Sequence, residues 1–194
     1  MDETTEPASV AVPWQVEWRV ARQQVTYLAL SVTVVVLAAL ALGMLAAGMQ
    51  AGRDEARSVD LALVVTPAVP PESLADHTFE LYRRGYAPRV VVTGEGREGL
   101  KAQLVTRGVP ETQVTLGAEP PGMAALQTIT RAVYARGETS LLLVTTPEET
   151  LTALKIARDQ GLRAYGSPVP GVAPDVLRLA LASVHYWQYA LSGT

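Results

Sequence analysis

Residues Val25–Met49 read VTYLALSVTVVVLAALALGMLAAGM, and no charged residue falls between Arg22 and Arg53. A helix rises about 1.5 Å per residue, so this stretch is long enough to cross the roughly 30 Å hydrocarbon core of a bilayer. Leu and Val dominate it, and no charge opposes their insertion. The stretch therefore predicts one transmembrane helix, with a short tail before it and one α/β domain after it.

A cleaved signal peptide and a buried helix are the alternatives to a membrane anchor. A signal peptide has a basic start and a shorter apolar run, whereas this chain starts with Asp2, Glu3 and Glu6. The small residues Ala46–Gly48 would suit a peptidase, so cleavage stays open. A buried helix of a soluble protein is seldom apolar all round at this length. The chain has no cysteine, which excludes a lipoprotein anchor.

The segments before the apolar stretch differ from one another. Residues 1–12 are acidic and contain proline, which predicts a flexible tail. The predicted interfacial and transmembrane segment, residues 13–50, begins with Trp14 and Trp18, which are spaced to share one helix face. Tryptophans beside arginines are typical of a helix that enters a membrane interface. An aromatic contact with a partner subunit is the alternative for this pair.

Small residues recur every four positions in the predicted transmembrane helix, at Ala39, Gly43 and Ala47. Such a stripe lets a second helix approach closely, as in many membrane protein complexes. The alternative is that alanine is simply abundant here. Arginines flank the helix on both sides, so the positive-inside rule does not select an orientation.

Charge and composition exclude several classes of function. The net charge is −3 and no basic block is present, which argues against a nucleic-acid partner. The absence of cysteine removes disulfides, thiol catalysis and thiolate metal sites together. The only histidines, His77 and His185, are far apart in the sequence. We therefore expect no metal site and no cofactor.

The segment after a short polar linker (residues 51–58) predicts an α/β domain at residues 59–194. Short apolar runs alternate with amphipathic stretches that end at glycine. Strands are predicted at residues 60–66, 88–93, 112–116, 140–146 and 162–166, and helices at residues 72–85, 97–107, 123–136, 147–160 and 175–191. Strands that are apolar throughout favour a parallel sheet covered on both faces. The sequence thus predicts a Rossmann-like three-layer domain with a mostly parallel five-stranded sheet.

A ligand of such a domain binds beyond the carboxyl ends of the strands. Polar residues and one glycine stand at these ends, and we take them as candidate ligand-binding residues: Thr66, Thr93, Gly94, Glu95, Thr145, Thr146 and Glu149. The turn at Thr93–Gly96 is the one glycine-rich turn at a strand end, and an ordinary tight turn explains it without a ligand. Neither a dinucleotide fingerprint nor a P-loop is present.

Two other polar features have simple structural explanations. Glu148 and Glu149 fall in the predicted first turn of a helix, where carboxylates favourably meet the helix dipole. No activated acid is expected there. His77 falls on a predicted helix away from the strand ends, which favours a surface or packing role over that of a base.

The stretch ESLADHTFELYRRGYAPRVVVTGE, at Glu72–Glu95, resembles a signature of the YdcF/SanA-like (ElyC/SanA/YdcF) family of bacterial envelope-associated proteins. The resemblance extends over about residues 59–171. Its pieces are a strand that starts at Asp60, Leu81-Tyr82, Gly85, Ala87-Pro88, Gly108-Val109-Pro110 and Val144-Thr145-Thr146. It implies the same fold, an anchor before the domain, and a domain outside the cytoplasm.

The polar site motifs of that family are largely replaced in this chain. The family looks glycine-rich after the first strand, where Thr66-Pro67-Ala68 stands here, and carries Ser-Gly-Gly where Thr93-Gly94-Glu95 stands. Its Asn-Thr-x-Glu-Asn block corresponds to about residues 121–126, which hold no Asn, Thr or Glu. Its later histidine and arginine correspond to Glu149 and Thr152. The resemblance thus implies a retained fold with lost chemistry.

Two functions fit the sequence. The first is a non-catalytic, single-pass accessory or structural subunit of a larger membrane complex, with lipid and other membrane subunits as partners and no small-molecule ligand. A respiratory or photosynthetic assembly would be a fitting host, although no residue points to one. An exposed aromatic C-terminus at Tyr186, Trp187 and Tyr189 would support an interface, whereas a buried one would be ordinary core. The second is an envelope enzyme acting on a nucleotide-like or cell-envelope precursor ligand, with Glu95 or Glu149 as general base.

Overall fold

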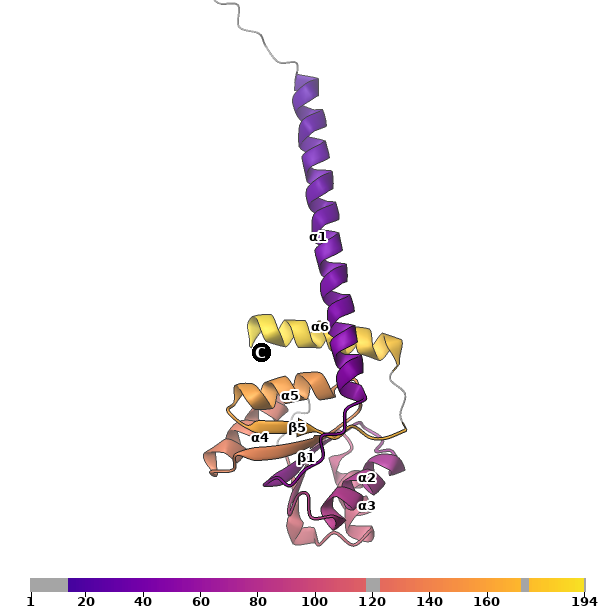
Figure 1. Cartoon of the computed structure of the whole chain (residues 1–194), viewed down its shortest axis with the longest axis vertical. Coiled ribbons are helices and arrows are strands. Elements are labelled where there is room, and N and C mark those ends of the chain that lie inside the picture. The colour runs from indigo at the N-terminus through magenta and orange to yellow at the C-terminus, as the bar shows by residue number, and fades with distance from the viewer. Residues whose placement is uncertain (1–13, 118–122, 172–174, 194) are drawn as a thin grey trace, which may run out of the picture. The chain divides into compact units, whose positions relative to one another are not determined.

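The computed structural model describes residues 14–117, 123–171 and 175–193, so the predicted tail at residues 1–12 lies outside the described residues. Helices and strands alternate as the sequence predicts (Figure 1). Their order is α1 (Trp14–Ala51), β1 (Leu61–Thr66), α2 (Glu72–Arg83), β2 (Val90–Gly94), α3 (Arg97–Thr106), η1 (Glu111–Gln113), β3 (Val114–Leu116), α4 (Met123–Ala135), β4 (Ser140–Val144), α5 (Thr150–Asp159), β5 (Arg163–Gly166) and α6 (Val176–Ser192).

The five strands form one sheet in the order β3-β2-β1-β4-β5. Every pairing is parallel, for example Ala62 with Val90 and Ala62 with Leu142. The chain winds outward from β1 to β3 and then returns to β4 on the other side of β1. The predicted Rossmann-like domain is therefore confirmed, with an all-parallel sheet and a topological switch point between β1 and β4.

Alternate residues of the buried strands face opposite layers of helices. In β1, Ala62 and Val64 belong to the core cluster that also contains residues of α2 and α3. Leu61 and Leu63 belong to the cluster with α4 and α5. Because side chains alternate along a strand, this division covers both faces of the sheet. It explains why the strands are apolar throughout.

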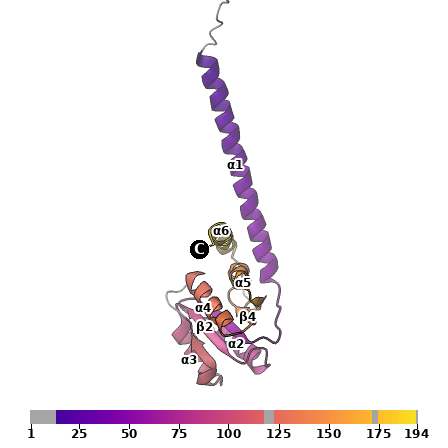
Figure 2. The same ribbon diagram turned by 90° about the vertical axis from the view of Figure 1, so that its left-hand side faces the viewer.

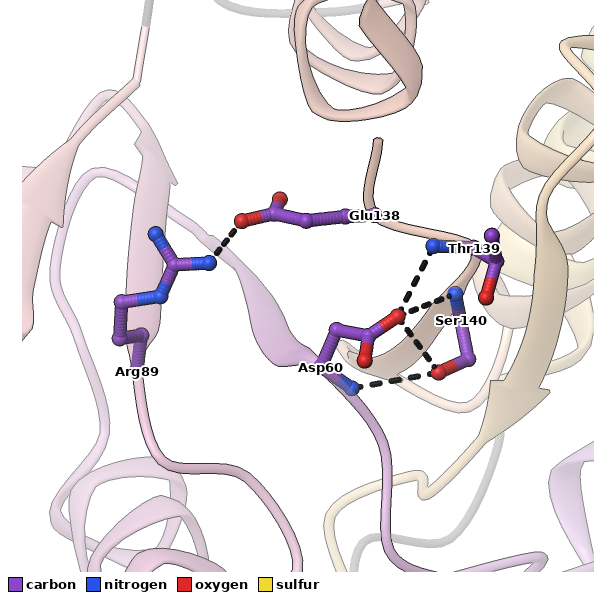
Figure 3. Close-up of polar contacts among 5 residues, drawn as sticks. All are labelled: Asp60, Arg89, Glu138, Thr139 and Ser140. Atoms are coloured by element: carbon purple, nitrogen blue, oxygen red, sulfur yellow. Dashed lines mark hydrogen bonds and ion pairs between the residues drawn. The ribbon is translucent and has the colours of Figure 1, made fainter. Parts of the chain in front are cut away.

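A polar clamp joins the amino ends of β1 and β4 (Figure 3). The carboxylate of Asp60 accepts hydrogen bonds from the backbone N–H groups of Thr139 at 2.8 Å and Ser140 at 2.9 Å, and from the Ser140 hydroxyl at 3.0 Å. These bonds hold the pKa of Asp60 below its ordinary value of 3.8, with the backbone N–H of Thr139 as the largest cause. Arg89 pairs with Glu138 beside the clamp.

The chain divides into two compact units, residues 1–39 and 40–194. The last turns of α1, from Leu40 on, belong to the second unit, and α6 lies beside them (Figure 2). Gly43 is buried, Ala47 is 2% exposed, and the Ser183 hydroxyl of α6 donates a 3.2 Å hydrogen bond to the Leu40 carbonyl. At Gly43 the stripe of small residues thus admits a helix of the same chain.

The predicted linker at residues 51–58 packs along the end of β5. The Glu55 N–H donates to the Gly166 carbonyl at 2.8 Å, and the Ser167 hydroxyl donates to the Asp54 carboxylate at 2.8 Å. The Arg57 guanidinium lies 4.1 Å from the ring centre of Tyr165. The compact unit therefore begins at Leu40, ahead of the predicted domain start at Val59.

Candidate functional site

One cavity of about 610 Å³ lies beyond the carboxyl ends of β1, β2 and β4, at the topological switch point. The seven residues that the sequence nominates all line it: Thr66, Thr93, Gly94, Glu95, Thr145, Thr146 and Glu149. They come from three strand ends that are distant in the sequence, and the parallel register brings them together. The wall continues into α5 and α6.

Among the residues that line the cavity, the only basic side chains come from helix α6. Arg178 and His185, seven residues apart on α6, both line the cavity, together with Leu181 and Ala182. Sequence reasoning missed Arg178 and His185 because it searched only the strand ends. They are, however, the only arginine and histidine within α6, which is a pattern that could have singled them out.

The buried threonines differ in how their hydroxyls are satisfied. The Thr66 hydroxyl donates to the Pro67 carbonyl at 3.2 Å, and the Thr145 hydroxyl donates to the Glu149 carboxylate at 3.3 Å. Thr93 is 2% exposed, and its hydroxyl has no hydrogen-bond partner among the described residues. A buried polar group without a partner costs about 1–3 kcal/mol, so this hydroxyl is available to a ligand or a water molecule.

Glu148 is the buried carboxylate of the cavity wall, at 4% exposure. One carboxylate oxygen accepts a 3.3 Å hydrogen bond from the Asp175 N–H, and the other has no partner within the described part of the chain. The helix predicted from Pro147 begins only at Thr150, because a turn closes first with the Glu149 N–H on the Thr146 carbonyl. Glu148 thus precedes the helix instead of occupying its first turn.

The glycine-rich turn after β2 is explained by close packing against the turn after β1. Gly94 has φ 108°, and a Cβ atom there would lie 2.0 Å from the Thr66 carbonyl oxygen. A Cβ atom at Gly96 would lie 2.3 Å from the Pro67 carbonyl oxygen. Any side chain would collide with backbone, so these glycines serve the fold. They give no evidence of a phosphate-binding loop.

No family model, no curated protein and no solved structure matches this chain. The resemblance to the YdcF/SanA-like family therefore stays a prediction. The Asp60 that opens its signature lies at the amino end of β1, in the clamp described above. The stretch compared with the Asn-Thr-x-Glu-Asn block falls partly on residues 118–122, outside the described residues.

His77 lies outside the cavity at the strand ends. It lines a second hollow of about 510 Å³, where its Nε2 atom is 2.9 Å from the Ser167 hydroxyl oxygen. Burial is the main cause that lowers the pKa of His77 below its ordinary value of 6.5. Ser167 is fully buried and also binds Asp54, so this chain of hydrogen bonds ties α2 to the linker.

The chemistry of the cavity at the strand ends combines hydroxyls, carboxylates, one guanidinium and one imidazole. Carboxylates and threonine hydroxyls accept hydrogen bonds from hydroxyl and amino groups, and Arg178 can pair with one anionic group. Within the described ranges, no group of three or more His, Asp or Glu side chains is placed to hold a metal ion. The expectation that the chain needs no metal or cofactor stays a prediction.

Proposed function

We propose that this chain is a single-pass membrane protein whose α/β domain binds a small polar ligand in the cavity at the strand ends. The observation that carries the proposal is the pair of buried oxygens in one cavity wall, on Thr93 and Glu148, that have no hydrogen-bond partner among the described residues. Native proteins satisfy nearly all buried polar groups, so two such oxygens in one wall favour an absent partner. This differs from the first hypothesis drawn from the sequence, which expects no ligand.

The wall favours a ligand rich in hydrogen-bond donors, such as a sugar or an amino sugar. Three carboxylates line the cavity, from Glu95, Glu148 and Glu149, against the single guanidinium of Arg178. Carboxylates repel a bare phosphate, and no glycine loop among the described residues offers backbone amides in compensation. Turnover of such a ligand, as in the enzyme hypothesis, would use a wall carboxylate or His185 as general base.

Thr93→Val tests the binding proposal. The hydroxyl has no partner, so its removal should leave the free energy of unfolding of the ligand-free protein unchanged or slightly higher. The purified full chain in detergent is heated with glucosamine, N-acetylglucosamine or inorganic phosphate. We expect one of the two sugars to raise the unfolding temperature, and phosphate to do so less or not at all.

The matched variants decide whether any such shift comes from this cavity. Thr93→Val and Glu148→Gln should reduce the sugar-dependent shift, whereas Thr106→Val, an exposed threonine on α3, should keep it. A shift of equal size in all variants would place binding elsewhere. No shift with either sugar would count against the donor-rich ligand class.

Membrane anchoring by α1 is supported by length and composition. Within the described residues, Ala21–Ala51 is the one helical stretch long and apolar enough to cross a bilayer. Trp18 is 70% exposed near its start, which suits a membrane interface. We propose a bacterial cell membrane with the domain outside the cytoplasm. A reporter fused after residue 194 that is active only in the cytoplasm would reverse this orientation.

An accessory subunit of a larger membrane complex is the second candidate, favoured by the exposed Trp18. Other features behind it are used inside the chain, because Gly43 packs against Ser183 and Trp187 of α6. Trp187 packs edge to face on Tyr186, with ring centres 5.6 Å apart, and Tyr189 is 4% exposed. Gentle detergent extraction of the native protein, followed by sizing, tests this candidate. Stoichiometric co-migration with a large complex would favour it.

A further inference from the structure

The apolar face of α6 has no protein covering it among the described residues. Leu177, Leu181, Val184 and Leu191 are 68%, 53%, 47% and 85% exposed. Their spacing of three, four and seven residues places them on one side of the helix, which they share with the exposed Gln188. Buried residues Ala182, Ser183 and Tyr189 lie on the other sides. A helix with one exposed leucine- and valine-rich side needs an apolar environment there.

The place where α6 meets α1 identifies that environment. Ser183 and Trp187 approach Gly43 so closely that a Cβ atom there would lie 2.0 Å from the Ser183 hydroxyl oxygen. Figure 1 shows α6 running across the last turns of α1, and Figure 2 shows it end-on beside them. Gly43 lies ten residues before Arg53, the first charge after the span, which is about 15 Å along a helix.

The crossing point corresponds to the edge of a bilayer core when the hydrocarbon span is counted from Gln24, the second residue after Arg22. Twenty residues counted from Gln24 end at Gly43, and about twenty apolar helical residues span the hydrocarbon region. A helix that crosses α1 at Gly43 therefore lies where acyl chains meet headgroups. This argument rests on the proposed membrane anchoring.

The composition of α6 suits this depth. No acidic residue lies between Val176 and Ser192, and Arg178 is the only side chain there that is charged at all ordinary pH values. Trp187, a residue type enriched at membrane interfaces, lies beside Gly43, where a Cβ atom would be 3.1 Å from its indole Nε1 atom. Helices that lie in an interface combine an apolar face with aromatic and basic residues.

We infer that α6 is a second membrane contact, which lies in the bilayer interface with Leu177, Val184 and Leu191 in lipid and with Leu181, which also lines the ligand cavity, beside them. The same helix forms one wall of the ligand cavity through Arg178 and His185. Contact with the membrane surface would therefore help to hold this wall of the cavity in place. The occupant of the apolar face is lipid, and not a second copy or a partner subunit.

The absence of cysteine from the chain makes a direct test possible, because one introduced cysteine carries one label. Three full-length variants are labelled with an environment-sensitive fluorophore and reconstituted in phosphatidylcholine vesicles. Val184→Cys reports on the apolar face of α6. Leu30→Cys, at a position 59% exposed on α1, reports on the anchor. Val105→Cys, at a position 37% exposed on α3, is the matched valine control.

Nitroxide-labelled lipids and aqueous iodide are then compared as quenchers. We expect the Val184 label to lose fluorescence to lipids with a shallow nitroxide and to be shielded from iodide. The Leu30 label should respond to a deep nitroxide, and the Val105 label to iodide alone. If Val184→Cys fails to fold, Leu177→Cys replaces it with the same expected result.

The outcomes separate this inference from the anchoring proposal. Quenching of the Leu30 label by lipid, with the Val184 label open to iodide, would overturn the inference and keep the anchor. A Val184 label shielded from both quenchers would indicate a protein on the apolar face and would also overturn it. Failure of lipid to quench the Leu30 label would remove the anchor on which the inference rests.

Discussion

Asp60 is the residue whose contacts define the amino edge of the sheet. Its carboxylate receives two backbone N–H groups and one hydroxyl, all from residues at the start of β4. Asp60→Ala should lower the free energy of unfolding by about 1–3 kcal/mol, since the N–H groups of a charge-assisted clamp lose their acceptor. Asp76→Ala is the control, because Asp76 only joins a surface pair with Arg107. Equal losses in urea unfolding of both variants would contradict the clamp.

The same carboxylate makes stability depend on pH in the acid range. The pKa of Asp60 in the folded protein lies below 3.8 because the clamp favours the ionised form. Its contribution is therefore complete above about pH 4 and is lost as the pH falls through the lowered pKa. Thermal unfolding between pH 5 and pH 2 should show a smaller decline for Asp60→Ala than for the unchanged chain.

His77 gives a pH dependence in a different range. Burial lowers its pKa below 6.5, so the folded state favours the neutral ring. Stability should be complete above about pH 6.5 and should fall as the pH drops from there toward the lowered pKa. His77→Gln keeps a polar side chain beside Ser167 and should unfold with a flatter profile between pH 7 and pH 5. A profile as steep as that of the unchanged chain would assign the effect to another group.

The packing of α6 on α1 can be tested at the level of the two helices. Gly43→Val should separate them, because even a Cβ atom would collide with Ser183, and overpacking of this kind costs about 1–3 kcal/mol. Gly48→Val is the matched control, since no atom lies within 4 Å of the Cβ position there. The unfolding temperature in detergent should fall for the first variant more than for the second. A reversed order would contradict the packing.

The order of helices and strands could be predicted from the sequence because its determinants are local. Apolar runs such as residues 140–144 and stops such as Gly85, with φ 74°, act over a few residues. The start of α5 at Thr150 could not be predicted, because the turn at Thr146–Glu149 sets it and Pro147 does not. The contact between Gly43 and α6 could not be predicted either, because the two segments are far apart in the sequence and meet only in the folded chain.

Half of the candidate site follows from the same local reasoning. Parallel strands place their carboxyl ends together, so the sequence alone nominates Thr66, Thr93 and Thr145. It does not nominate Arg178 and His185, since nothing local tells on which side of the sheet the last helix lies. The burial of Glu148 is likewise invisible in the sequence, because neighbouring Glu149 has the same sequence context and is exposed.

At the scale of the whole molecule, the compact unit includes the last turns of α1 and the linker. A fragment of residues 40–194 includes the end of α1 and the linker that packs on β5, whereas a fragment of residues 59–194 begins at the predicted domain start. The second fragment lacks the Leu40 carbonyl that accepts from Ser183. It also lacks Glu55 and Asp54, so Gly166 and Ser167 lose their hydrogen bonds to the linker. We expect it to unfold at a lower temperature in the same detergent. Equal unfolding temperatures would show that residues 40–58 are dispensable.

The clamp at Asp60 lies at the amino ends of the strands, and the candidate cavity lies at their carboxyl ends. Substitutions at Thr93, Glu95 or Glu149 leave the clamp bonds untouched, because those bonds all form at the amino ends of β1 and β4. Side chains of the cavity wall can therefore be exchanged without loss of the clamp that joins β1 to β4. A scaffold of this kind is open to redesign, since new ligand specificities can be introduced at one edge without rebuilding the other.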